Sequence, residues 1–571
     1  MRPCIRSLPV RGIVVAAASI AMCCCGKASP AADQPEVIAV MACDGYADLR
    51  DQLGWVGEQV GNPTLAGFAE SFLLLATQGK GLAGLDLQRP MGVVVTTEGG
   101  PLPSAHAFIP VKDLGKFLGV IEGMTGPVEE QDGVRRIAIQ GAPPVTITEK
   151  NGWAIVSEEG ATAGIDDPLP LIGPIVEDYS IAVQVFPSRM PDDMRRRLGD
   201  MLDDAARDAE ARGEVMDAGM LKAAIDNFDD VEKMLLGFAV DQDKKLLLLD
   251  TTAVMTPGSA AADAWTGAAQ AAATVGSPAT SDGKPAAIRG HYAQAVPAAD
   301  RGVVEAGLQD LLSSAGIDPM ATTLAGLAGD IVAAMLETGN VDAGLTLDTS
   351  AADAEHPLPS LTVGMRIKDG VALEKKVKER LGAANALPPN VSVKFDAGKQ
   401  GDARLHEITA DVSGTPAAGP LVGDKVTLTL AVLPEYAYLM AGGDVPARLA
   451  AAIAAGGKPL PDLKPITGVE MSLASLIGYA AMITKAFSPD DPQGEMLGEV
   501  AEQAAAMDAT QVRLGMRPVE RGATLRLSAD AGAIQTIAAG VAMQQAGPPQ
   551  MQRPRPRAEG ALPEGASTLA P

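Results

Sequence analysis

The stretch "SLTVGMRIKDGVALEKKVKERL", residues 360–381, places a strand, a turn and a helix in direct succession. Its first part alternates as a strand does, Lys368 and Asp369 mark the turn, and the remainder has the spacing of an amphipathic helix. The stretch "AHAFIPVKDLGKFLGVIEGM", residues 105–124, has the same order, with Lys112 and Asp113 at its turn. The chain should therefore combine strands and helices throughout its length.

Two further correspondences follow in the same order along the chain. The segment "NGWAIVSE" (151–158) matches "PEYAYLMA" (434–441), and the hairpin "LLGFAVDQDKKLLLLDTTA" (235–253) matches "TQVRLGMRPVERGATLRLSAD" (510–530). Each hairpin leads into an alanine-rich helix, at 259–273 and at 532–545. We interpret the fold as α+β, with two tandem, diverged repeats of mainly antiparallel sheet packed with helices. Two unrelated α+β domains are the alternative.

Further elements are predicted in the first half. Strands are expected at 91–98, 105–111, 135–140, 153–158 and 180–186, and helices at 64–78, 111–124 and 191–212. Alternation between Val426 and Val432 indicates a strand with one buried face and helices packed across it.

Composition and periodicity divide the chain into six segments. They are a signal peptide (1–25), a linker (26–36), the first repeat (37–273), a linker (274–285), the second repeat (286–546) and a disordered, proline-rich tail (547–571).

The N-terminus is typical of export. Three arginines precede the uncharged apolar run "GIVVAAASIAM", and the 14 residues from Gly12 to Cys25 would span about 21 Å as a helix, too short for a bilayer core. The cysteines that follow resemble the end of a bacterial lipoprotein signal, so the lipid acceptor is expected to be Cys23, Cys24 or Cys25. An ordinary signal peptide cleaved within "ASPAA" (28–32) is the alternative, and three adjacent cysteines cannot easily surround one metal ion.

Charge and composition exclude some partners. The formal net charge is −25 and aromatic residues make up 3%, so nucleic acid is a poor partner, because phosphates are repelled and few rings can stack on bases. A lone Cys43 after signal removal cannot form an internal disulfide and is expected to be a buried apolar thiol.

Compact catalytic motifs are absent from the sequence. The glycines of "GKGLAG" (79–84) follow a helix and precede a strand, the reverse of a dinucleotide-binding loop, so they should end a helix and turn the chain. The sole S-x-x-K, Ser281 to Lys284, lies in the predicted linker without companion motifs. The four histidines are far apart, and none has the spacing of a metal site: His106, His291, His356 and His406.

Acidic clusters offer only weak candidates for calcium. The segment "DNFDD" (226–230) and the group Asp490, Asp491 and Glu495 lack the spacing of a calcium loop, so helix caps and turns explain them better. No metal or cofactor is expected.

Most of residues 37–275 resembles a family of uncharacterised exported proteins of planctomycete-type bacteria. The likeness is carried by "GKGLAGLDLQRPMGVVV" (79–95), "FIPVKDLGKFL" (108–118) and "NGWAIVS" (151–157). It implies export and a shared fold but assigns no activity and no functional residue.

These observations predict a non-catalytic protein of the cell envelope, either secreted or held at the periplasmic face of a membrane as a lipoprotein. It would bind an envelope protein or an apolar ligand. The alternative is a secreted hydrolase whose carboxylate or serine site assembles in space. A closed pocket joining Asp or Glu to His406 or His106 would favour the hydrolase, and an open apolar concavity would favour binding.

Overall fold

The computed structural model describes residues 36–546, apart from 98–102, 132–133, 139–142, 162–163, 212–227, 269–273, 276–285, 297, 299–300, 303–305, 307–318, 351, 353–357, 384–386, 414–422, 456–465, 489–490 and 508. The predicted signal peptide, all but Glu36 of the first linker, most of the second linker and the tail therefore lie outside the described residues.

Strands dominate the described chain. They are β1 (Glu36–Cys43), β2 (Met91–Thr97), β3 (Pro103–Pro110), β4 (Glu129–Gln131), β5 (Val134–Ile137), β6 (Val145–Lys150), β7 (Trp153–Glu158), β8 (Ile181–Val185), β9 (Val231–Asp241), β10 (Leu246–Met255), β11 (Ile288–Ala295), β12 (Asn340–Asp348), β13 (Ser360–Arg366), β14 (Val391–Gln400), β15 (Ala403–Asp411), β16 (Lys425–Val432), β17 (Tyr436–Ala441), β18 (Thr467–Ser472), β19 (Gln511–Val519) and β20 (Gly522–Asp530).

Helices lie between and after these strands. They are α2 (Tyr46–Gln59), α3 (Leu65–Ala76), α4 (Leu114–Thr125), α5 (Leu169–Val176), α6 (Asp192–Ala211), α8 (Ala260–Ala268), α10 (Pro319–Leu336), α11 (Gly370–Gly382), α13 (Val445–Ala455), α14 (Leu473–Phe487), α15 (Pro492–Ala505) and α16 (Ala531–Ala546), with short 3₁₀ turns at Pro187–Arg189 and Phe228–Asp230.

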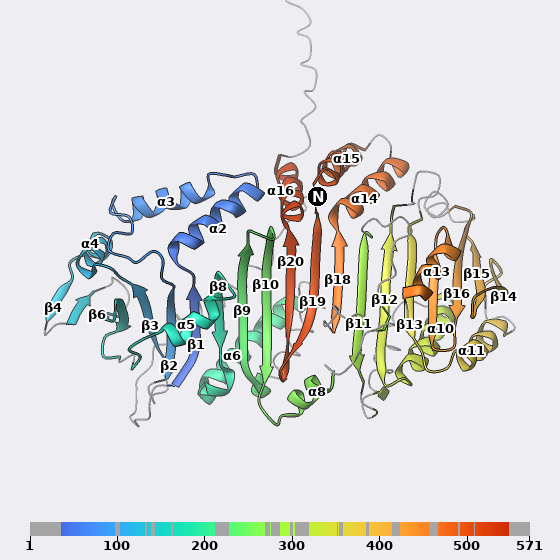
Figure 1. Ribbon diagram of the computed structural model, residues 1–571, viewed down its shortest axis with the longest axis horizontal. Helices are drawn as coiled ribbons and strands as arrows, with labels where there is room; N and C mark the ends of the chain where they lie inside the picture. The colour runs from blue at the N-terminus through green and yellow to red at the C-terminus, as the bar shows by residue number, and fades with distance from the viewer. Residues whose placement is uncertain are drawn as a thin grey trace, which may run out of the picture.

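All strand pairs among the described residues are antiparallel, and they join the strands into one large sheet (Figure 1). Across the sheet their order is β4, β5, β6, β7, β3, β2, β1, β8, β9, β10, β20, β19, β18, β11, β12, β13, β17, β16, β15 and β14. The prediction of an α+β fold with antiparallel sheet is confirmed.

The two halves of the sheet have the same strand order. The strand order of β1 to β10 in one half is the same as that of β11 to β20 in the other. For example, β1 lies between β2 and β8, and β11 lies between β12 and β18. The halves meet where β10 pairs with β20, with Leu246 opposite Asp530 and Val254 opposite Gly522.

Cross-strand register divides the side chains between two faces, because directly opposite residues in an antiparallel pair point the same way. The apolar face is the one that carries Phe238 and Leu249, which lie opposite each other. The polar face is the one that carries Asp250 and Arg526, which also lie opposite each other.

Helices cover the two ends of the sheet on both faces. On the apolar face, α4 packs over β6 and β7 at one end, and α10 and α11 pack over β13, β15, β16 and β17 at the other. On the polar face, α5 and α13 cover the corresponding ends. Nearer the middle, α8 packs on the apolar face against Met234 and Ala253. Helices α2, α3, α14, α15 and α16 lie beyond the upper ends of the strands (Figure 1).

The two Lys-Asp turns form as predicted, and each aspartate caps the helix after it. Asp113 accepts a hydrogen bond from the backbone N–H of Lys116. Asp369 accepts from the N–H groups of Val371 and Ala372. Such caps satisfy N–H groups that have no partner inside the helix and contribute about 1 kcal/mol each, which fixes where α4 and α11 begin.

The structure differs from expectation in the second half of β16, from Thr429 to Val432, where both faces are buried; in the first half Lys425 and Thr427 on one face are exposed. Leu430 and Val432 pack beneath α10 and α11, while Ala431 on the opposite face packs beneath α13. Helices therefore cover both faces of β16 at its end, and the expected single buried face holds only at its start. Thr274 and Val275, at the start of the predicted second linker, are held by hydrogen bonds to Asp342. None of the described helices combines the length and apolar character needed to cross a membrane.

Candidate functional site

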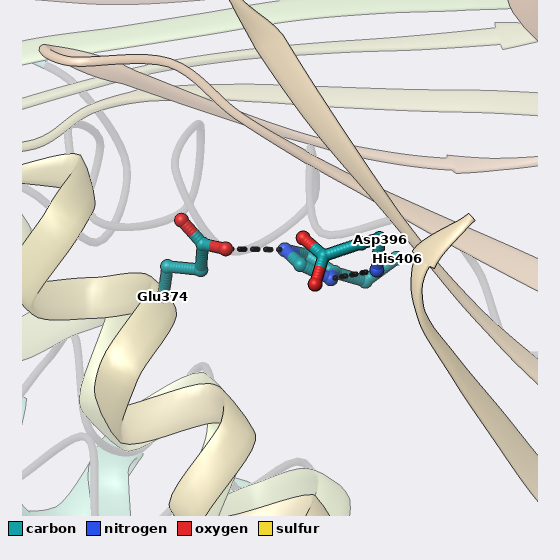
Figure 2. A group of neighbouring side chains, drawn as sticks. All are labelled: Glu374, Asp396 and His406. Atoms are coloured by element: carbon teal, nitrogen blue, oxygen red, sulfur yellow. Dashed lines mark hydrogen bonds and ion pairs between the residues drawn. The ribbon is translucent and has the colours of Figure 1, made fainter. Parts of the chain in front are cut away.

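Glu374, Asp396 and His406 meet where α11 packs over β14 and β15 (Figure 2). One ligand atom from each residue lies within 4.8 Å of the others. Glu374 and His406 are buried, whereas Asp396 is exposed. Figure 2 shows the Glu374 carboxylate reaching from the helix towards the imidazole of His406. Carboxylates and a histidine in such a group can hold a metal ion or transfer protons. Which role is open to them depends on the protonation of His406 and on the cations beside the two carboxylates.

The imidazole of His406 is held in one neutral tautomer. The backbone N–H of Asp396 donates to Nδ1 at 3.2 Å, so the ring proton is assigned to Nε2. Nε2 lies 3.7 Å from Glu374 Oε1, and it has no hydrogen-bond partner among the described residues. Burial lowers the pKa of His406 below its usual value, and the nearby carboxylate of Glu374 offsets this only in part. The ring is therefore neutral at pH 7.

Two cations already neutralise the carboxylates of this cluster. The ammonium of Lys378 lies 2.8 Å from Glu374 Oε1 and 2.8 Å from Asp396 Oδ2. Arg404 Nη1 lies 3.0 Å from Glu374 Oε2. Hydrogen bonding to the two carboxylates raises the pKa of Lys378, and the same contact lowers the pKa of Asp396. Because Lys378 fills the place of a metal cation and Nε2 carries a proton, the cluster is an ionic network that ties α11 to β14 and β15.

The sequence analysis named His406 but missed its two acidic neighbours. A register shift between Lys394 and Gly398 interrupts the β14–β15 pair, and Asp396 in the shift has a positive φ of 53°. This bulge aims the Asp396 N–H at the imidazole. The spacing of Glu374, Asp396 and His406 along the chain does not predict this contact.

A second histidine meets a serine inside the sheet. His106 Nδ1 lies 2.8 Å from Ser157 Oγ, and Nε2 lies 3.2 Å from Thr96 Oγ1. All three side chains are buried, so a substrate has no access to this serine–histidine pair. His291 is buried on β11 and fills the space over Gly468, and His356 lies outside the described residues.

Cys43 is a free, half-buried thiol at the end of β1. Its Sγ donates a hydrogen bond to the carbonyl oxygen of Met91. Burial raises the pKa of the thiol and so disfavours the reactive thiolate. The expectation of a buried apolar thiol therefore holds only in part, because the side chain is half-buried.

The glycine motif and the acidic motifs are structural where they are described. Gly79, Gly81 and Gly84 all have positive φ and lie between α3 and β2, as expected for a helix end followed by turns. Asp491 caps α15 by accepting from Gln493 N, and Asp229 lies 3.7 Å from Arg195. Glu495 lies exposed in the first turn of α15, and the predicted positions Asp226, Ser281, Lys284 and Asp490 lie outside the described residues.

A polar pocket of 650 Å³ lies at the end of β14, β15 and β16. Asn390, Ser392, Thr409, Asp411 and Lys425 contribute to its wall, and the histidine cluster does not. The pocket therefore supplies neither an apolar cavity nor access to His406.

A continuous row of apolar residues crosses the middle of the apolar face. Successive strands place these residues directly opposite one another: Cys43, Ile181, Phe238, Leu249, Leu527, Leu514, Val469, Gly290, Leu345 and Val363. At the usual spacing of about 4.8 Å between strands, this row runs for roughly 40 Å. No charged or polar side chain interrupts it.

This row is open to solvent where no helix packs over it. Ile181, Leu527 and Leu514 expose 39%, 39% and 38% of their surface. Along β12 the half-exposed residues are Leu345 and Leu347, whereas Thr346 and Asp348 on the polar face are buried. Contiguous exposed apolar surface of this kind marks a site of interaction with a ligand, a membrane or another protein.

The lipid-attachment candidates Cys23, Cys24 and Cys25 lie outside the described residues. No protein-family model matches the chain, and no match was found among curated proteins or among solved structures.

Proposed function

We propose that this chain is a non-catalytic, exported protein of the cell envelope that binds a ligand with acyl chains on its apolar face. The observation that carries the proposal is the uninterrupted apolar row from Cys43 to Val363 with half-exposed side chains at its centre. Covering such surface is favourable by about 25 cal/mol for each Å² removed from water.

The chemistry of the row favours acyl chains over other ligands. Apart from Cys43 and Gly290, its side chains are aliphatic except for Phe238, so it offers little stacking for sugars or bases and no charge for phosphates. A flexible hydrocarbon chain needs neither, because it is bound by burial and van der Waals contact alone.

The helices around the row favour a small ligand over a second copy of the chain. Two sheets that pack face to face approach to about 10 Å, and an α-helix is itself about 10 Å thick. Because α4, α8, α10 and α11 stand on the apolar face, they would hold a second flat sheet away from its centre. An acyl chain can lie between them.

Membrane attachment through one of Cys23, Cys24 or Cys25 is part of this proposal. The charged start, short apolar run and cysteine cluster support a lipoprotein signal, and the resemblance to exported proteins of planctomycete-type bacteria supports export. Mass spectrometry of the mature N-terminus tests the anchor. A peptide with an acylated N-terminal cysteine is expected, and an unmodified peptide that begins after Ala31 or Ala32 would contradict it.

We further propose that the two halves arose by tandem duplication. Their shared strand order and the equivalent caps Asp113 and Asp369 support this. So do two matching hydrogen bonds at the ends of the β10–β20 pair: Ala531 N donates to Lys245 O, and Met255 N donates to Arg521 O. Lys245 and Arg521 both have positive φ and directly precede these strands.

The binding proposal is tested with a fluorescent fatty acid and the chain without its first 25 residues, which keeps every described residue. The variant Leu514→Asn/Leu527→Asn places two amides at the centre of the row. Val371→Asn is the control on α11, where Val371 is an apolar residue that is 67% exposed. We expect the double variant to weaken binding about tenfold or more and the control to bind like the unaltered chain.

Equal binding by all three proteins would contradict the proposal. A concentration-dependent dimer in light scattering that the double variant abolishes, with no fatty acid bound, would assign the row to a protein partner instead.

A further inference from the structure

Helix α3 exposes a stripe of large apolar side chains that no other described element covers. Phe68, Phe72 and Leu75 are 70%, 65% and 78% exposed and lie at positions i, i+4 and i+7, so they share one side of the helix. The stripe has no charged residue, and the helix carries only Glu70, which pairs with Arg50 of α2 on another side. Two of the nine phenylalanines of the whole chain are in this stripe.

Helix α3, which carries the stripe, packs closely against α2. Gly57 of α2 allows α3 to approach closely, since a Cβ there would lie 2.9 Å from Leu65 Cβ and 2.6 Å from the carbonyl oxygen of Asn62. Helix α2 is in turn joined to α16 by a hydrogen bond of 2.8 Å between Gln535 and Gln59. The stripe therefore belongs to a helix that is packed against the fold and lies beyond the strand ends (Figure 1).

We propose that α3 lies on the surface of a phospholipid bilayer and inserts Phe68, Phe72 and Leu75 among the lipids. Amphipathic helices bind bilayers in this way, with aromatic and aliphatic side chains at the boundary between headgroups and acyl chains. The proposal rests on the lipid anchor proposed above, because the anchor would hold the helix near a membrane.

The length of chain between anchor and fold supports a membrane as the occupant. From Cys25 to Glu36, where β1 begins, the chain has 11 residues and can extend about 36–40 Å. Strand β1, with 8 residues, spans about 26 Å and leads directly towards α2 and α3. The anchor can therefore reach the end of the sheet at which α3 lies.

The charge of the protein adds a prediction about lipid type. Removal of the first 25 residues, which contain Arg2, Arg6 and Arg11 and no acidic residue, takes the formal charge from −25 to −28. An anionic bilayer should repel this chain, so α3 should prefer zwitterionic lipid and should bind by insertion even at high salt.

The test is flotation of the chain without its first 25 residues on phosphatidylcholine vesicles. We expect the chain to float, Phe68→Ser/Phe72→Ser/Leu75→Ser to lose binding about tenfold or more, and the control Val371→Ser to float like the unaltered chain. Substituting anionic phosphatidylglycerol should weaken flotation. About 0.5 M salt, which shortens the Debye length to roughly 4 Å, should not abolish flotation on zwitterionic vesicles.

Failure of the chain to float, or equal flotation of the triple variant, would overturn the proposal. A change of oligomeric state in the triple variant without any flotation would also overturn it, in favour of a second copy on α3. The apolar row is tested separately, because Leu514→Asn/Leu527→Asn should still float while it loses the fatty acid, and the α3 variant should do the reverse.

Discussion

Arg526 donates two hydrogen bonds to Asp250 across β10 and β20, the pair of strands that joins the halves of the sheet. Nε donates to Oδ1 at 2.7 Å and Nη2 donates to Oδ2 at 2.6 Å. Asp250 is almost fully buried on the polar face, and Tyr179 OH donates to its Oδ2 at 3.0 Å. The two residues lie directly opposite in the β10–β20 register, midway between the matching bonds at Lys245 and Arg521. Asp250 and Arg526 occupy equivalent positions of β10 and β20. If β10 paired with the β10 of a second copy, Asp250 would face another Asp250, and the same holds for Arg526 in β20. The opposite charges therefore favour pairing of β10 with β20.

This relationship predicts a charge-swap rescue. Removal of one partner from a buried ion pair costs about 3–5 kcal/mol, and because Arg526 is about one-third exposed we expect about 3 kcal/mol for Asp250→Asn. Arg526→Asp, which opposes two carboxylates, should be worse, and Asp250→Arg/Arg526→Asp should recover part of the loss. Urea unfolding measures these changes, with Arg207→Gln on the exposed side of α6 as a control whose midpoint stays nearly unchanged. A double variant no more stable than Arg526→Asp would contradict the pairing role.

Two tyrosines should ionise unusually late. Burial, with the nearby Asp250, raises the pKa of Tyr179 to about 12, and burial raises the pKa of Tyr438 to about 12. Since the folded pKa lies above the unfolded value of about 10, these hydroxyls stabilise the fold below pH 10 and lose that contribution as pH rises through 12. Absorbance at alkaline pH should therefore show late phenolate formation, reduced in Tyr179→Phe and Tyr438→Phe. Ionisation of both groups near pH 10 would contradict this.

His406 should make stability depend on mildly acidic pH. Burial holds its folded pKa below 6.5, so the unfolded chain binds the proton more readily, and this contribution to stability is present above about pH 6.5 and is lost as pH falls below it. Asp396, whose pKa is lowered by Lys378, acts only in a more acidic range. We expect His406→Asn, whose carbonyl can still accept from Asp396 N–H, to flatten the unfolding free energy between pH 7 and 5. An unchanged slope would show that His406 is not the titrating group.

The ionic network should exclude metal until Lys378 is removed. Lys378→Ala leaves Glu374 and Asp396 without the ammonium between them, so a divalent cation should raise the melting temperature of this variant by about 2–4 °C. The same cation should leave the unaltered chain unchanged. Lys375→Ala, an exposed lysine on the same helix that pairs with Glu379, is the control and should behave like the unaltered chain. Stabilisation of the unaltered chain by the metal would instead favour a native metal site.

Gly237 should tolerate no side chain. A Cβ there would lie 2.3 Å from the ring of Tyr179, the residue that also contacts Asp250, so Gly237→Ala should cost about 1–3 kcal/mol in urea unfolding. Gly478→Ala in α14 is the control, because nothing lies within 4 Å of its Cβ position and alanine is the better helix former. Equal effects of the two changes would mean that the close approach of Tyr179 is not what requires glycine.

Local chemistry allowed the sequence to determine most of the elements. Alternation predicted β2, β3, β7 and β8, helical spacing predicted α3, α4 and α6, and the Lys-Asp turns located the starts of α4 and α11. These features depend on neighbours a few residues apart, so they can be read along the chain. The N-terminal cysteine cluster is likewise a property of the sequence alone.

Tertiary structure decided which strands are neighbours and which side chains meet. Asp250 finds Arg526, and Glu374 finds Asp396 and His406, only because distant strands pair and a bulge at Asp396 redirects the backbone. Alternation also assigns residues to two faces without saying which face is covered. Along β12 the polar Thr346 and Asp348 are the buried residues and Leu345 and Leu347 the half-exposed ones, because helices and neighbouring strands, not periodicity, determine what water can reach.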